Sequence, residues 1–150
     1  MSNVIIREFF DKDIHMILEL LYELGRPKPE KDSDVQTFSK LVKKYLDDSD
    51  KKILVAYLDG IEIAGMVSAV LLPRLNHSTL ELYIPELIVR QKYQNQGIGR
   101  KLINSCISLG QEKNCHRIRL ESGNKRKESH QFYKNMGFQQ SGLSFTKILD

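Results

Sequence analysis

One stretch, Glu86–Leu102 (ELIVRQKYQNQGIGRKL), constrains the fold of this chain more than any other. An apolar strand, Leu87–Val89, leads through a short polar loop into two glycines, Gly97 and Gly99. A helical pattern begins at once, because apolar side chains then recur at three- and four-residue intervals. These side chains are Ile98, Leu102, Cys106 and Leu109.

A strand, a glycine turn and a helix start together predict an anion-binding site. The first amides of a helix have no intrahelical partner, and the helix dipole favours negative charge there. Glycines remove the Cβ atoms that would hold a phosphate away from the backbone. Two nucleotide-binding patterns do not fit, because Leu102 stands where a Rossmann turn has its third glycine and G-x-x-x-x-G-K-[ST] is absent. A plain tight turn is the alternative.

Length and composition predict one globular domain over residues 1–150. The chain has 41% hydrophobic and 28% charged residues, enough for one sizeable core. No apolar run approaches the roughly 18 residues of a membrane span, and the N-terminus lacks a signal-peptide pattern, so we expect a cytoplasmic protein without a membrane partner. The net charge of +4 suits either nucleic acid or a polyphosphate cofactor. Without a nucleic-acid-binding or zinc motif, neither a nucleic-acid partner nor a metal site is predicted.

The periodicity predicts an α/β fold with a mixed sheet. Expected helices cover residues 14–24, about 33–46, 98–113 and 128–136, and Gly25 and Gly137 end the first and the last. In the second helix, Val35, Phe38, Leu41, Val42 and Tyr45 are expected to face inward. Expected strands cover residues 4–9, 53–58, 61–72, 79–89, 117–121, 138–140 and 144–149, with hairpin turns at Asp59-Gly60 and Ser141-Gly142.

The strand at 79–89 changes phase in its middle. Leu80, Leu82 and Ile84 share one face, whereas Leu87 and Val89, after a proline, have the opposite parity. A slip of one residue beside a proline predicts a β-bulge.

Two motifs give the chain a family resemblance. Gln94-x-x-Gly97-x-Gly99 resembles the [RQ]-x-x-G-x-[GA] pyrophosphate loop of the GNAT N-acetyltransferases. Downstream, Phe132-Tyr133 and Gly137-Phe138 stand at the spacing of that superfamily's A-x-x-[FL]-Y-x-x-x-G-F helix end. The element order is also similar, and two segments resemble the aminoalkylphosphonate N-acetyltransferases. The chain departs from the family pattern at Gln91, Gln94 and Ser129, where proline, arginine and alanine are commoner.

The resemblance implies a single-domain GNAT-like fold, with a mixed, mostly antiparallel sheet flanked by about four helices. It implies acetyl-CoA as co-substrate and acetyl transfer to the primary amine of a small molecule, by direct attack through a tetrahedral intermediate. Homodimers are common in that superfamily. The residues expected to bind acetyl-CoA are Leu87, Ile88, Val89, Gln94, Asn95, Gln96, Gly97, Ile98, Gly99, Arg100, Lys101, Asn124, Arg126 and Tyr133.

Two catalytic residues are expected. A primary amine of pKa ~10.4 is mostly protonated at neutral pH, at a cost of roughly 4–5 kcal/mol, so the transfer calls for a base. Glu86 is that candidate, with Glu81 in reserve, and the alternative is a strand glutamate that is exposed or paired with Arg119. Tyr133 is the candidate acid for the leaving thiolate, and a core aromatic residue is its alternative. A backbone N–H near Leu87 would serve as the oxyanion donor.

Other functions remain open from the sequence. The same fold would serve acetylation of a protein or peptide amine, which calls for an open groove. A non-catalytic acyl-CoA sensor is disfavoured by the presence of both Glu86 and Tyr133. The loop at Arg26–Lys28 is a candidate contact for an anionic group on the substrate, with solvated loop cations as the alternative.

Overall fold

The computed structural model describes residues 3–123 and 126–149. The chain forms two compact units, Met1–Arg119 and Leu120–Asp150. Asn124, one of the predicted cofactor contacts, lies outside the described residues.

A six-stranded sheet forms the centre of the first unit. Its strands lie in the order β1-β2-β3-β4-β6, and β5 also pairs with β3. Four of the pairings, β1–β2, β2–β3, β3–β4 and β3–β5, are antiparallel. The strands are β1 (Val4–Glu8), β2 (Lys51–Leu58), β3 (Glu62–Leu72), β4 (Glu81–Ile84), β5 (Leu87–Val89) and β6 (Arg117–Leu120). The hairpin predicted at Asp59-Gly60 is confirmed, since both residues have positive φ, 53° and 70°.

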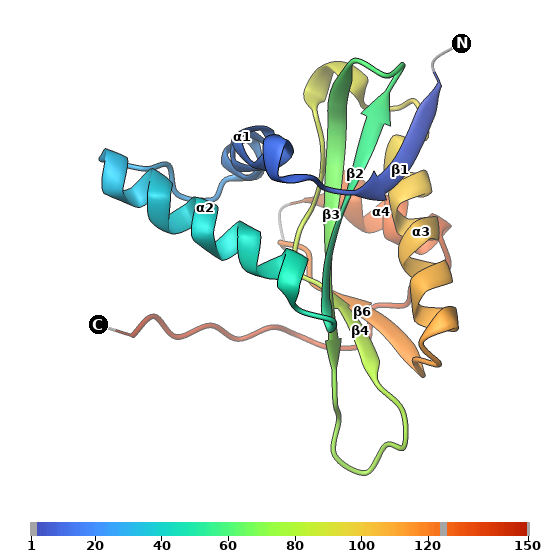
Figure 1. The fold of residues 1–150 in the computed structure, drawn as a ribbon. Helices are drawn as coiled ribbons and strands as arrows, with labels where there is room; N and C mark the ends of the chain where they lie inside the picture. Colours follow the sequence, from blue (N-terminus) through green and yellow to red (C-terminus); the bar gives the residue numbers. More distant parts are fainter. Residues whose placement is uncertain (1–2, 124–125, 150) are drawn as a thin grey trace. The chain divides into compact units, whose positions relative to one another are not determined.

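Helices cover both faces of this sheet. The helices are α1 (Ile14–Leu24), α2 (Asp32–Asp47), α3 (Ile98–Glu112) and, in the second unit, α4 (Lys127–Asn135). Figure 1 shows α1 and α2 on one side of β2 and β3, and α3 on the other. Because both faces are covered, β3 is buried along most of its length. The predicted α/β architecture, with a mixed, mostly antiparallel sheet and four helices, is confirmed.

The predicted phase slip is a break between β4 and β5. On β3, Val67 and Val70 are three residues apart, but their partners Leu87 and Tyr83 are four apart. One extra residue therefore lies on the β4–β5 side, as in a β-bulge, and the segment Pro85-Glu86 occupies the break. The bulge splits the expected strand 79–89 into two shorter strands.

Two predictions were wrong. The hairpin expected over residues 138–149 does not form, and the described part of this segment has no strand. Most of its apolar side chains are exposed, for example Phe145 at 89%, because the short second unit offers them no sheet edge to join, whereas Phe138 packs against Tyr133. In α2, Val35 and Leu41 were expected inside but are 39% and 53% exposed. The apolar face of α2 is wider than the core that it covers, and only Val42 in it is fully buried.

Candidate active site

Glu86 lies in the break between β4 and β5, and its side chain is held from two sides. Its Oε1 atom accepts a 2.7 Å hydrogen bond from Ser68 Oγ, and its backbone N–H donates to the same Oγ at 3.0 Å. Its Oε2 atom accepts a 3.2 Å bond from Arg26 Nη2. Ser68 is buried at 1% exposure, whereas the Glu86 side chain is 20% exposed. The carboxylate is therefore fixed in direction but still accessible. Its partner is Arg26, not the predicted alternative Arg119.

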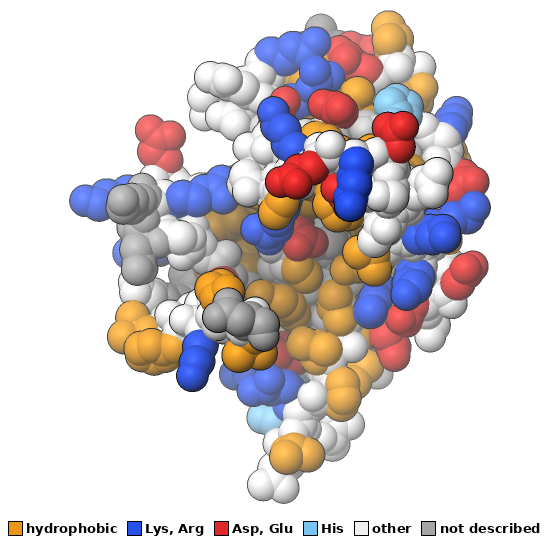
Figure 2. Space-filling view, turned by 90° about the vertical axis from the view of Figure 1, so that its left-hand side faces the viewer, with side chains coloured by type: hydrophobic (Ala, Val, Ile, Leu, Met, Phe, Trp, Pro, Cys, Tyr) orange, Lys and Arg blue, Asp and Glu red, His pale blue; other side chains and the backbone are white. Residues whose placement is uncertain are grey.

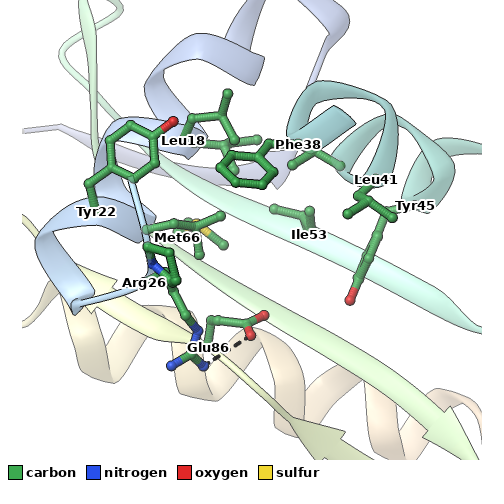
Figure 3. Close-up of a pocket in the computed structure, with 13 residues that line it drawn as sticks. Leu18, Tyr22, Arg26, Phe38, Leu41, Tyr45, Ile53, Met66 and Glu86 are labelled. Atoms are coloured by element: carbon green, nitrogen blue, oxygen red, sulfur yellow. Dashed lines mark hydrogen bonds and ion pairs between the residues drawn. The ribbon is translucent and has the colours of Figure 1, made fainter. Parts of the chain in front are cut away.

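The Glu86 carboxylate faces a pocket of about 290 Å³ between α1, α2 and the sheet. Seen from the α1–α2 side, hydrophobic side chains gather in the middle of this face of the molecule (Figure 2). Figure 3 shows Arg26 and Glu86 at one end of the pocket, with Leu18 and Phe38 at the other. The lining residues are Ile17, Leu18, Leu21, Tyr22, Arg26, Pro27, Phe38, Leu41, Val42, Tyr45, Ile53, Met66 and Glu86.

Tyr45 adds a polar atom to this pocket without adding charge. Burial raises the pKa of its phenol, and the negative charges of Glu86 and Asp48 raise it further. The hydroxyl is therefore protonated at neutral pH, and Figure 3 shows it pointing toward the end where Glu86 lies.

The outer edge of β5 is available for hydrogen bonding. Ser68 N donates to Glu86 O at 2.9 Å, and Arg90 N donates to Ala64 O at 2.8 Å. Because the bonding edges alternate along an antiparallel strand, Leu87 and Val89 direct their N–H and C=O groups away from β3. Within the described residues, β3 is the one strand that pairs with β5. The carbonyl of Val89 accepts a 3.1 Å bond from Gln94 Nε2, which ties the strand to the loop that follows.

Gly65 allows β3 and β5 to approach closely at this point. A Cβ atom at Gly65 would lie 2.7 Å from Ile88 O and 3.2 Å from Val89 Cα. Both of these atoms are backbone, so neither can move aside as a flexible side chain can. The site therefore depends on a glycine here, twenty-one residues before Glu86.

The predicted anion loop has the local geometry of a helix-terminal binding site. Asn95 and Gly97 both have positive φ, 63° and 82°, and Gly97 is the N-cap of α3. No side chain caps the helix, its first turn has no acidic residue, and a Cβ at Gly97 would meet nothing within 4 Å among the described residues. Arg100 and Lys101 are exposed beside it. Uncapped amides, open space and nearby cations fit the pyrophosphate of a CoA molecule.

Two further cations near the loop are already paired. Arg90 Nη1 lies 3.3 Å from Glu62 Oε2, and Lys92 Nζ lies 3.6 Å from Glu62 Oε1. Arg100 and Lys101 are therefore the better candidates for a phosphate contact.

Tyr133 lies in the second unit, on α4. Its ring packs edge-on against Phe132 and Phe138, with centroid distances of 5.3 and 5.9 Å. Burial raises the pKa of its phenol, against an opposing effect of Arg126. His130, next to these aromatic residues in sequence, donates a 2.8 Å hydrogen bond from Nε2 to Gly123 O. Gly137, with φ 92°, ends α4 as predicted.

Glu81, the reserve candidate for the base, is a buried ion-cluster residue. Its side chain is fully buried, and its Oε1 accepts bonds from Arg117 at 2.6 Å and Arg119 at 3.1 Å. Its Oε2 lies 3.8 Å from Arg74 Nη1. Burial alone would raise the pKa of Glu81, but the hydrogen bonds and charges of Arg117 and Arg119 hold it below the ordinary value. This carboxylate has no open face for an amine.

Four residues that contribute to the site were missed or given another role in the sequence analysis: Ser68, Arg26, Phe38 and Leu41. Ser68 is a polar residue inside an apolar strand (EIAGMVSAVLL), and that isolation was the available signal. Arg26 was a candidate contact for a substrate anion, with a solvated loop cation as the alternative, and its contact with Glu86 was not anticipated. Phe38 and Leu41 were assigned to the core, whereas they line a pocket.

Comparison with known proteins gives the family of this chain. Residues 14–138 match the model of the Acetyltransferase (GNAT) family, and the chain belongs to that family. Members of this acetyltransferase family use acyl-CoA.

Individual curated relatives match only part of this chain, at low sequence identity. The chain is 31% identical to the aminoalkylphosphonate N-acetyltransferase of Salmonella typhimurium over 88 residues, which is 59% of this chain and 57% of that protein. The chain spans about half the length of the curated relatives it matches, 57% of one and 49% of another.

Solved structures extend the likeness over nearly the whole chain. A transcriptional regulator from Bacillus halodurans C-125 superposes with a TM-score of 0.89 at 25% identity, covering 98% of this chain and 100% of that one. An aminoglycoside N-acetyltransferase solved in complex with CoA superposes with a TM-score of 0.84 at 16% identity, covering 99% and 96%. The second of these shows a shared fold. In the part of the chain that the structure describes, no helix is long and apolar enough to cross a membrane.

Proposed function

We propose that this chain is an acetyl-CoA-dependent N-acetyltransferase that acts on the primary amine of a small molecule, with residues 1–150 as one catalytic domain. The observation that carries the proposal is the position of Glu86. An accessible carboxylate stands at the end of an apolar pocket, in a strand break, and the exposed edge of β5 follows it directly. The names of the relatives support an amine acceptor. A pocket of about 290 Å³ suits a small molecule better than a peptide.

Separate groups of residues would bind the pantetheine arm and the pyrophosphate of acetyl-CoA. The edge groups of Leu87 and Val89, with Ile88 between them, would bind the pantetheine arm. Acetyl-CoA supplies the activated acetyl group. The amides of the anion loop and helix start would hold its pyrophosphate, with Arg100, Lys101 and Arg126 as charged contacts. The loop and helix-start residues are Gln94, Asn95, Gln96, Gly97, Ile98 and Gly99.

Glu86 would take a proton from the bound ammonium, directly or through water, so that the free amine attacks the acetyl carbon. The new C–N bond forms through a tetrahedral intermediate as the C–S bond breaks. The products are the N-acetyl amine, CoA thiol and one proton. Tyr133, whose raised pKa keeps its phenol protonated, would return a proton to the leaving sulfur.

Thiol release from acetyl-CoA tests this function. The purified chain is assayed at neutral and mildly alkaline pH against arylalkylamines, polyamines, amino sugars, aminoalkylphosphonates and short peptides. We expect turnover with one class of amine, reduced in both Glu86→Gln and Tyr133→Phe. Turnover that neither substitution changes would keep the enzyme but reject the proposed base and acid. Acetyl-CoA binding without turnover on any amine would indicate an acyl-CoA sensor.

A further inference from the structure

Several apolar side chains that line the pocket are partly exposed to solvent. In α2, Leu41 lines the pocket and is 53% exposed, and Phe38 and Tyr45 are only partly buried. Leu and Phe side chains placed at a partly open surface lose little contact with water unless another molecule covers them. The apolar face of α2 therefore has room for an apolar ligand.

Charge in the pocket is confined to one end. Among the described lining residues there are one cation, Arg26, and one anion, Glu86, and they contact each other at 3.2 Å. The Tyr45 hydroxyl is neutral, because burial and nearby negative charge raise its pKa. A ligand that fills the pocket can therefore satisfy one positive group, at Glu86, and must present apolar surface everywhere else.

The volume of the pocket, about 290 Å³, suits a small-molecule ligand, and because the pocket is open at Leu41, which is 53% exposed, part of that ligand can remain in solvent. An aromatic ring or a branched alkyl chain with a short aminoalkyl arm has this size.

We propose that the acceptor is a primary amine carried on an aromatic or branched-alkyl group, whose apolar body contacts Phe38, Leu41 and Met66 while its nitrogen meets Glu86. This inference rests on the proposed function and specifies its substrate. The ammonium would share Glu86 with Arg26. The existing contact of 3.2 Å is longer than the ~2.7–2.9 Å of a strong charge-assisted bond, and Arg26 is half exposed, so sharing is feasible.

The same features disfavour two other classes of small amine. A polyamine would place a second ammonium against the apolar walls of α1 and α2, without a carboxylate to receive it. An aminoalkylphosphonate would have to share Arg26, the one cation of the described lining, with Glu86, and its short body would leave the apolar walls of α2 uncovered.

The first experiment compares acceptors in the thiol-release assay. We expect kcat/KM for 2-phenylethylamine and isoamylamine to exceed that for putrescine and 2-aminoethylphosphonate by at least about tenfold, since each buried methylene contributes a factor of about ten or more. Turnover that favours putrescine, 2-aminoethylphosphonate or a peptide would overturn this inference and leave the proposed function standing. Absence of thiol release with every amine would overturn the proposed function itself.

A second experiment tests the contact with α2. Leu41→Gln changes an exposed lining residue, and Leu46→Gln changes a residue of the same helix that is 44% exposed and lies outside the lining. We expect Leu41→Gln to raise KM for 2-phenylethylamine about five- to tenfold with little change in kcat, and Leu46→Gln to match the parent protein. Equal effects of the two substitutions, or no effect of Leu41→Gln, would overturn the placement of the apolar group.

A binding measurement is independent of turnover. Calorimetry compares 2-phenylethylamine with 2-phenylethanol, which has the same body and no charge. We expect the amine to bind at least about tenfold more tightly, and Glu86→Gln to remove most of that difference. An equal affinity for amine and alcohol in the parent protein would refute the contact between the nitrogen and Glu86.

Discussion

Two glutamates five residues apart, Glu81 on β4 and Glu86 in the following break, show how environment separates a structural carboxylate from a functional one. Glu81 is fully buried, and Arg117 and Arg119 bind it at 2.6 and 3.1 Å. Glu86 is 20% exposed and has one looser ionic contact, to Arg26. Arginines of the protein balance the charge of Glu81, although its buried Oε2 has no hydrogen-bond partner among the described residues, whereas Ser68 fixes the direction of the Glu86 carboxylate and leaves one side open to a ligand.

The bulge produces this difference. Along an uninterrupted strand, residues 81 and 86 would point to opposite faces, and the strand would pair along its whole length. The extra residue between β4 and β5 changes the register instead, and the edge of β5 beyond Glu86 is left without a strand partner among the described residues. A single irregularity therefore separates the part of the strand that stabilises the unit from the part that we assign to catalysis.

The largest effect expected from this comparison is on activity. Glu86→Gln keeps the shape of the side chain and its bond from Ser68 but removes the base. We expect kcat/KM to fall about 100- to 10,000-fold, or roughly 3–5 kcal/mol, while the free energy of unfolding changes by less than about 1 kcal/mol. Thiol-release kinetics and urea denaturation measure the two quantities. A large loss of stability with a proportionate loss of activity would make Glu86 a structural residue like Glu81.

Glu81→Gln is expected to reduce stability and to leave the KM of the folded protein unchanged. Removing the buried charge leaves Arg117 and Arg119 without their anion, and such a loss typically costs about 3–5 kcal/mol. Both arginines are partly exposed, at 47% and 32%, and can regain water. We therefore expect a loss of about 2–4 kcal/mol in the free energy of unfolding, read from the urea midpoint. The KM for the amine of the protein that remains folded should be unchanged, and a raised KM would contradict the separation of the two roles.

Much of this arrangement was predictable from the sequence. The parity change between Leu82 and Leu87 beside Pro85 gave the bulge, because an alternating pattern records which face of a sheet each residue occupies. Gly97 and Gly99, directly before an apolar helical pattern, predicted the turn and the start of α3 at Ile98. Both features depend on local backbone geometry, which neighbouring residues determine.

The remainder depends on contacts between distant residues. Arg26 and Glu86 are sixty residues apart, and nothing in either local sequence shows that they bind each other. The apolar face of α2 was predicted, but periodicity alone does not distinguish a side chain that packs in the core from one, such as Leu41, that lines a pocket. The wrong hairpin at residues 138–149 has the same cause, since alternation indicates a strand only where a partner edge exists.

A smaller effect is expected at the backbone behind Glu86. Gly65→Ala would place a methyl group 2.7 Å from Ile88 O, so β3 and β5 must separate. We expect a loss of about 1–3 kcal/mol in stability and, unlike Glu81→Gln, a fall in kcat/KM of the protein that remains folded. The matched control is Gly110→Ala in α3, where the nearest atoms to an added Cβ lie at 3.7–3.8 Å. That substitution should be neutral or stabilising by up to about 1 kcal/mol, because alanine favours a helix. Equal costs at the two glycines would argue against a special closeness of β3 and β5.

The smallest expected effect is on how the free energy of unfolding changes as the pH falls. The pKa of Glu81 is lower in the folded protein than its ordinary value of 4.5, because Arg117 and Arg119 outweigh the effect of burial. Below pH 4.5 the unfolded chain therefore binds more protons at this group than the folded chain does, and the stabilisation that it contributes above 4.5 is lost as pH falls through the folded pKa. Urea midpoints measured from pH 7 down to about pH 3 should fall less steeply below pH 4.5 in Glu81→Gln than in the parent.

Asp13 supplies a positive control for this measurement, because its substitution should have the same effect. Burial acts to raise its pKa, but the hydrogen bonds from Arg7 and the Phe10 N–H, with the charge of Arg7, lower it overall. Its contribution has the same sign as that of Glu81, so Asp13→Asn should also flatten the acid limb, and the double variant should flatten it further. Parallel curves for Glu81→Gln and the parent would show that the arginine cluster does not hold Glu81 ionised. The contrast between a satisfied and an available carboxylate would then rest on burial alone.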